Sequence, residues 1–153
     1  MLVLTRQKLP VFDRSKVAPA KGLLKGAYIL SKEHKDSPDI ILMATGSEVQ
    51  LILGAQEKLQ KEDISTRVVS MPCWEIFEQQ SEDYRDEVLP KQVKKRLAVE
   101  AGASFGWCRW TGDSGAVIGV DKFGSSAPAK ENFRHYGFTI ENVVDRAKEV
   151  ISD

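Results

Sequence analysis

The sequence has little cysteine, no net charge and no long apolar run, and each shortage excludes a class of protein. Its two cysteines, Cys73 and Cys108, fit neither a disulfide framework nor a Cys-x-x-Cys zinc site. Lys plus Arg and Asp plus Glu number 22 each, so no overall field attracts nucleic acid or an anionic membrane. The apolar runs are well short of the about 18 residues of a transmembrane helix, and no signal peptide is visible. We therefore expect a cytoplasmic protein with reduced thiols.

One segment indicates the fold class. The apolar run 40–44 stops at Thr45-Gly46, and Ser47 and Gln50 then open a stretch with helical periodicity. A Ser-x-x-Gln pattern is typical of a capping box, in which the serine hydroxyl caps the helix and the glutamine reaches back. A buried strand that feeds a helix through a tight turn is half of a βαβ unit. The sequence therefore predicts an α/β fold with a parallel sheet.

The helix expected over 48–61 has one apolar face. Its apolar side chains, Ile52 among them, recur at helical spacing. We expect the polar residues Glu48, Gln56 and Glu57 to point outward into solvent.

The other elements follow from periodicity and turn residues. At 153 residues and 42% hydrophobic, the chain can bury the core of one domain. The last helix should begin at its cap Thr139, with Phe138 packed on Val143 as a hydrophobic staple. Strands are expected over 2–7, 25–30, 39–45, 66–71, 96–100 and 116–120, and further helices over 75–77, 81–89 and 130–136.

Two glycine-containing turns invite functional interpretations. A helix N-terminus at Gly46-Ser47 offers free N–H groups to an anion, but most such serines only satisfy their own helix, and no GxGxxG pattern is present. We therefore interpret Ser47 as structural. Gly112-Asp113-Ser114-Gly115 is similar to the sequence around a trypsin-type nucleophile, yet the two histidines, His34 and His135, stand in a charged loop and at a helix end. We expect a turn before a strand here, and no hydrolase.

Aromatic residues cluster at Phe105, Trp107 and Trp110. Such density is found in stacking platforms for a base or sugar, but more often in a core or an interface. Cys73 follows a Met-Pro turn and has no basic neighbour in sequence, so we expect an inert, partly buried thiol.

Six short motifs in order resemble the C-terminal domain of transketolases. Each is weak alone, but together they span roughly residues 2–151. They are Leu4-Thr5-Arg6-Gln7, Ala44-Thr45-Gly46-Ser47-Glu48-Val49, Val68-Val69-Ser70-Met71-Pro72, Val99-Glu100-Ala101-Gly102, Phe123-Gly124-x-Ser126-Ala127-Pro128 and Tyr136-Gly137-Phe138-Thr139.

This resemblance implies a fold and a division of the chain. The fold is a three-layer α/β sandwich with a small, mostly parallel sheet and one antiparallel strand. Residues 1–21 would be the end of the preceding pyrimidine-binding domain with a linker, and residues 22–153 the C-terminal domain. A boundary strand at 2–7 with no partner sheet is expected where a longer chain has been cut.

The resemblance also implies an activity. Transketolases transfer a two-carbon ketol unit between sugar phosphates, in the pentose phosphate pathway and the Calvin cycle, using thiamine diphosphate and a divalent metal, magnesium or calcium. Arg6 matches the family's arginine that holds the sugar phosphate, and a guanidinium fork suits phosphate oxygens. The Gly-Asp-Gly motif with its distal asparagine is missing, so we expect no catalytic residue, no cofactor-binding residue, no metal site and no turnover in this chain alone.

Family likeness further implies partners: the remaining domains and the second subunit of a homodimer, which makes subunit contact the favoured role of the aromatic cluster. Two alternatives stay open. One is a stand-alone regulatory module that binds a small anion at the helix N-terminus. The other is a domain of a related thiamine enzyme, of the deoxyxylulose phosphate synthase or pyruvate dehydrogenase β-subunit type.

Overall fold

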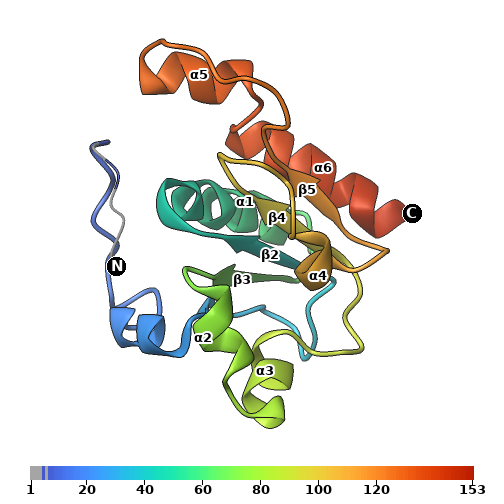
Figure 1. Cartoon of the computed structure of the whole chain (residues 1–153). Coiled ribbons are helices and arrows are strands. Elements are labelled where there is room, and N and C mark those ends of the chain that lie inside the picture. The colour runs from blue at the N-terminus through green and yellow to red at the C-terminus, as the bar shows by residue number, and fades with distance from the viewer. Residues whose placement is uncertain (1–4, 6) are drawn as a thin grey trace.

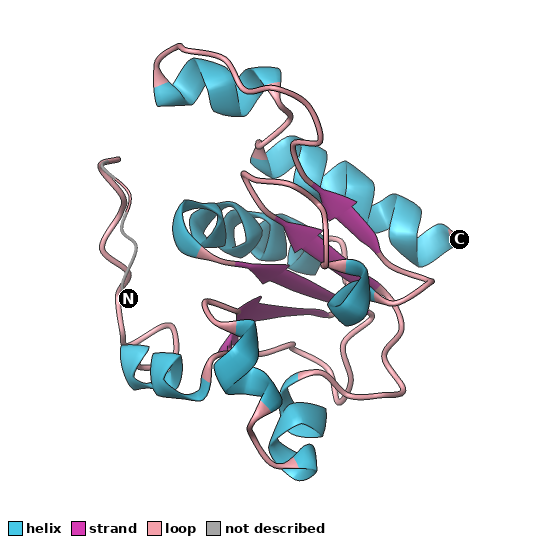
Figure 2. Ribbon diagram, viewed as in Figure 1, coloured by secondary structure: helices cyan, strands magenta, loops and turns pink. Residues whose placement is uncertain are grey.

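The computed structural model describes residue 5 and residues 7–153, and these residues form a three-layer α/β sandwich (Figures 1 and 2). Its sheet has the order β1-β3-β2-β4-β5. Strand β1 runs antiparallel to β3, and the other neighbouring pairs are parallel. The expected fold class is confirmed. The strands are β1 (Tyr28–Ser31), β2 (Ile40–Ala44), β3 (Thr66–Ser70), β4 (Arg96–Val99) and β5 (Ala116–Ile118).

Helices cover both faces of the sheet. The long helices α1 (Val49–Lys61) and α6 (Ile140–Ser152) pack on one face, and α2 (Trp74–Glu78), α3 (Glu82–Val88) and α4 (Cys108–Thr111) lie on the other. Helix α5 (Ala129–His135) projects from the body and buries none of its residues. Since β2 lies in the middle and is covered on both sides, all five of its residues are buried, as a continuous apolar run predicts.

The boundaries of the expected strands and longer helices lie within a few residues of those observed. The strand expected over 2–7 falls largely on residues outside the described part of the chain. Three elements were not expected: α4 and the 3₁₀ turns η1 (Ala20–Lys25) and η2 (Gly46–Glu48). All three are too short to show a helical period in the sequence.

Gln56 is a correction to the expected outward face of α1. Its side chain is 4% exposed, and its amide donates to the Lys32 carbonyl at 3.0 Å and the Thr66 carbonyl at 2.7 Å. A buried amide is tolerated because these two bonds satisfy its donors. Glu57, by contrast, is exposed as expected.

A buried ion pair joins the β1–β2 connection to β3. The guanidinium of Arg67 pairs with the Glu33 carboxylate and also donates to the Glu87 carbonyl at 2.7 Å. The hydrogen bond from Arg67 lowers the pKa of Glu33. Both side chains are about nine-tenths buried, so losing either partner would leave an uncompensated charge.

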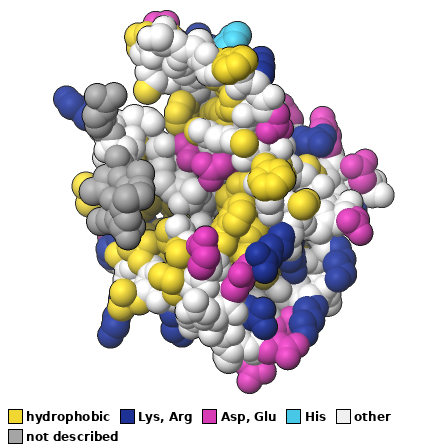
Figure 3. Space-filling model, viewed as in Figure 1, with side chains coloured by type: hydrophobic (Ala, Val, Ile, Leu, Met, Phe, Trp, Pro, Cys, Tyr) yellow, Lys and Arg dark blue, Asp and Glu magenta, His cyan; other side chains and the backbone are white. Residues whose placement is uncertain are grey.

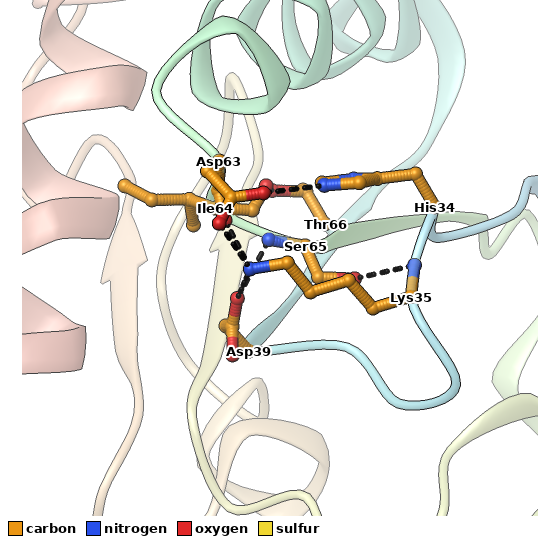
Figure 4. A network of polar contacts seen from close by, with 7 residues as sticks. All are labelled: His34, Lys35, Asp39, Asp63, Ile64, Ser65 and Thr66. Carbon is orange, nitrogen blue, oxygen red and sulfur yellow. Dashed lines mark hydrogen bonds and ion pairs between the residues drawn. The ribbon is translucent and has the colours of Figure 1, made fainter.

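A second polar network lies at the amino-terminal edge of the sheet (Figure 4). The main-chain N–H of Ser65 donates to Asp39 at 2.6 Å, and the Lys35 ammonium lies 3.1 Å from the Asp63 carboxylate. His34 lies 3.4 Å from Asp63. These contacts tie together the loops that enter β2 and β3. The network therefore has a structural role at the edge of the sheet opposite the carboxyl ends of the parallel strands.

Helix α6 begins as the sequence predicts, and a substitution tests its cap. Thr139 accepts a hydrogen bond from the Asn142 N–H at 3.2 Å. Thr139→Ala should lower the free energy of unfolding by about 1 kcal/mol, the usual cost of a lost cap. Chemical denaturation would measure this, with Ser37→Ala in the exposed β1–β2 loop as the control that should change stability little. Equal effects of both substitutions would contradict the capping role.

Candidate functional site

The candidate site lies where the order of strands reverses. From β2 the chain passes to β3 on one side, and later returns to β4 on the other side of β2. The carboxyl ends of parallel strands meet at the same edge, and in open α/β sheets the crevice at this reversal is the usual place for function. Here the edge brings together Glu48, which lies beyond the end of β2, and Glu100, which follows β4.

Glu48 reaches the edge through an unusual turn. After β2, Gly46 adopts a φ of 58°, in the left-handed region that favours glycine, and Gly46–Glu48 form a 3₁₀ turn η2 before α1. This turn directs Glu48 inward, and the residue is only 4% exposed. The Ser47 hydroxyl donates to its carboxylate, and the main chain of Ala101 also hydrogen bonds to it.

Both carboxyl groups at this edge have a raised pKa. Burial raises the pKa of Glu48, although its hydrogen bonds offset part of that rise. Burial, and secondly the charge of Glu48, raise the pKa of Glu100 to about 7. Two neighbouring carboxyls that interact in this way titrate as a pair. With its pKa at about 7, Glu100 changes its protonation state near neutral pH, while Glu48 accepts the hydrogen bond from Ser47.

Glu100 opens on a small cavity of about 200 Å³. The wall opposite it comes from the segment after β3, where the Cys73 thiol donates to Glu75 at 3.4 Å. The other lining residues are Thr45, Met71, Pro72, Trp74 and Trp107. On the face shown in Figure 3, hydrophobic side chains gather near the middle, with charged side chains of both signs around them.

The capping box expected at Ser47 is wrong. Neither η2 nor α1 has a side-chain cap, because Ser47 lies inside the 3₁₀ turn and its hydroxyl is bonded to Glu48. Gln50 does reach back, but its amide donates to the Ser47 carbonyl at 3.1 Å. The serine hydroxyl is instead 3.4 Å from the side-chain amide of Gln7, which donates to it.

The aromatic cluster divides into core and surface. Trp107 and Trp110 are 2% and 8% exposed and belong to the core under α2, where Trp107 packs edge-on against Trp74 at 5.0 Å. Subunit contact, the favoured role, is therefore wrong for both tryptophans. Phe105, 92% exposed, remains available for such a contact.

The other sequence candidates do not converge on one site. Gly112–Gly115 forms the expected turn before β5, His34 lies at the opposite edge of the sheet, and His135 ends α5. Cys73 is half-buried as expected. Arg6 lies outside the described residues, while its neighbour Gln7 is described and contacts Ser47.

The sequence did not identify Glu48 and Glu100 as site residues. Glu48 was expected on the solvent-exposed face of its helix because the residue is polar. Glu48 and Gln56 stand four residues before and after the buried Ile52, so helical phase places both on the buried stripe. Glu100 directly follows the buried strand β4, and parallel topology would have brought it to the edge where β2 ends.

The described part of the chain offers neither a membrane-spanning helix nor a cluster of metal-ligating side chains. No helix there has the length and apolarity to cross a membrane. No three His, Cys, Asp or Glu side chains there are grouped to hold a metal ion.

The raised pKa of Glu100 predicts a pH-dependent stability. Its folded-state pKa of about 7 exceeds the ordinary 4.5, so the fold holds the proton more tightly than the unfolded chain does, and stability falls as pH rises through about 7. Glu100→Gln stays neutral and should therefore be more stable than the unsubstituted chain at about pH 8, with the gain shrinking toward pH 5. Denaturation midpoints at both pH values would measure this, with the exposed Glu57→Gln as control. A gain that does not change with pH would contradict the proposed titration.

Comparison with known proteins assigns the chain to a family. The family described as "Transketolase-like TK C-terminal domain" matches residues 26–139. The transketolase of Bacillus subtilis is 51% identical over 151 residues, which are 99% of this chain and 23% of that protein. The transketolase of Aquifex aeolicus is 50% identical over 148 residues, 97% of this chain and 21% of that protein.

A solved structure shows the same likeness. The transketolase of Pichia stipitis in complex with sedoheptulose-7-phosphate superposes with a TM-score of 0.84 at 37% identity, covering 96% of this chain and 20% of that one. The chain thus spans roughly a fifth of the length of these relatives. By the family match over most of its length, the chain belongs to the transketolase-like C-terminal domains.

Proposed function

We propose that this chain is the C-terminal part of a transketolase, which transfers a two-carbon ketol unit between sugar phosphates with thiamine diphosphate and a divalent metal. One observation carries the proposal: whole transketolases are about half identical to it over nearly its entire length. Residues 1–21 would then end the pyrimidine-binding domain, and residues 22–153 would form the C-terminal domain.

The described residues of this chain do not fit the cofactor. The carboxyl edge presents the acidic side chains of Glu48 and Glu100, and the carboxylate of Glu48, which accepts a hydrogen bond from Ser47, repels a diphosphate. The described residues also hold no group of three metal-ligating side chains. The cofactor and its metal would therefore be held by the other domains, and this domain would contribute positioning and assembly.

The acidic edge also weighs against a stand-alone anion-binding module. A helix N-terminus attracts anions through its free N–H groups, but here the buried carboxylate of Glu48 belongs to the residue that directly precedes α1.

The same proposal implies which partners the domain contacts and in which cellular compartment the enzyme works. The exposed aromatic side chains of Phe105 and Phe123, 92% and 99% accessible, suit contacts with the remaining domains or with the second subunit of a homodimer. The two free thiols, Cys73 and Cys108, suit the reducing cytoplasm.

Within the whole enzyme, Arg6 would hold the sugar phosphate. Arg6→Ala should raise KM for phosphorylated sugars with little change in kcat, because a remote phosphate contact is made equally in the ground and transition states. The lost charge-assisted hydrogen bonds should weaken binding by about 1.5–3 kcal/mol. Steady-state kinetics with phosphorylated sugars and with hydroxypyruvate would measure this.

The matched control is Arg85→Ala, which replaces an exposed arginine on α3. It should change neither the KM for phosphorylated sugars nor the KM for hydroxypyruvate. Equal losses for hydroxypyruvate and phosphorylated sugars in the Arg6 variant would show that Arg6 does not recognise the phosphate.

A binding measurement tests the assignment of the cofactor site to other domains. Calorimetric titration of this chain with thiamine diphosphate and magnesium should show no heat of binding. A dissociation constant on the order of micromolar, about −8 kcal/mol, would mean that this domain itself holds the cofactor.

A further inference from the structure

A contact between two distant parts of the chain links Gln7, the residue after Arg6 in the sequence, to the carboxyl edge. The side-chain amide of Gln7 donates to the hydroxyl of Ser47, 40 residues away, at 3.4 Å. Gln7 is half-buried and Ser47 is 8% exposed. The N-terminal segment runs beside this edge (Figure 1), and Gln7 also lines a cavity there with Gln50 and Phe138.

The direction of these hydrogen bonds is fixed by chemistry. A serine hydroxyl has one hydrogen, and here it is donated to the carboxylate of Glu48. The hydroxyl oxygen is thereby left to accept, and the amide of Gln7 supplies the donor. Glu48 cannot turn away to solvent, because it is buried and also bonded to the main chain of Ala101.

The Ser47 backbone is held as firmly as its side chain. The Gln50 amide donates to the Ser47 carbonyl at 3.1 Å, and the following helix α1 packs on the core. Since Ser47 caps no helix, its hydroxyl has no other partner among the described residues than Glu48 and Gln7. The arrangement is that of an anchor for the N-terminal segment.

We propose that Gln7, Ser47 and Glu48 form a positioning chain that fastens the N-terminal segment to the carboxyl edge and so places the adjacent Arg6 for the sugar phosphate. This inference rests on the proposed function of Arg6. Ser47 and Gln7 act through Arg6 and are positioning residues. The domain would in this way contribute to substrate binding through a contact that it makes with the end of the preceding domain.

Kinetics of the full-length enzyme test the positioning chain. Ser47→Ala and Gln7→Ala should each raise KM for phosphorylated sugars by about two- to tenfold, the scale of one neutral hydrogen bond, with kcat and the KM for hydroxypyruvate unchanged. Because both variants break the same link, the double variant should lose no more than the larger single loss. Ser47→Thr keeps a hydroxyl and should restore much of the affinity.

Matched controls separate the link from general damage. Gln80→Ala removes an amide that donates only to the Ile76 carbonyl of its own segment, and Ser152→Ala removes a hydroxyl that bonds within α6. Both should leave every kinetic constant unchanged. If Ser47→Ala fails to fold, Gln7→Ala, in a loop at the surface, carries the test alone.

The results of these experiments distinguish the positioning chain from the proposed role of Arg6 in binding the sugar phosphate. A phosphate-selective loss in Arg6→Ala but none in Gln7→Ala or Ser47→Ala would overturn the positioning chain and leave the role of Arg6 intact. An Arg6→Ala variant without a phosphate-selective loss would overturn the proposed role itself. Additive losses in the double variant would also contradict a single shared link.

Discussion

The burial of Glu48 at the carboxyl edge of the sheet is the constraint on which the rest of this edge depends. A carboxylate removed from water must be neutralised or hydrogen bonded. Here hydrogen bonds from the Ser47 hydroxyl and from the main chain of Ala101 meet that requirement. The bond to Glu48 uses the single hydrogen of the Ser47 hydroxyl, so its oxygen is left to accept from Gln7.

The two edges of the sheet accordingly have different roles. At the amino-terminal edge, Lys35, Asp39 and Ser65 tie loops of the same domain to one another (Figure 4). At the carboxyl edge, the strand reversal leaves a cavity beside Glu100 and a partner for the N-terminal segment. A domain can affect catalysis by placing a segment that contacts substrate, because small displacements of a binding group reduce rate.

Periodicity and turn chemistry predicted most of the fold. The buried run of β2, the stripe and cap of α6 and the break at Pro72 all have local signals in the sequence. The candidate site was less predictable. Glu48 and Gln56 were assigned to the surface from their polarity, although helical phase placed them with Ile52.

Other parts of the site had no local signal at all. The prediction of a Ser47 cap was wrong because Gly46 adopts a left-handed conformation and the helix starts later. A serine followed three residues later by a glutamine does not reveal this backbone conformation. The contact of Gln7 with Ser47 joins residues 40 positions apart and depends on the tertiary fold. Trp107 and Trp110 are buried in the core because Trp74 and Phe77 of α2 pack against them.

We expect this domain to act on substrate by holding Gln7 and so placing Arg6, the residue before it in the sequence. A crystal structure of the full-length enzyme with a sugar phosphate bound tests this most directly. It should show the Arg6 guanidinium on the phosphate, with the Gln7 amide donating to Ser47 and the Ser47 hydroxyl donating to Glu48. A structure in which Arg6 holds the phosphate while Gln7 and Ser47 lie apart would contradict it.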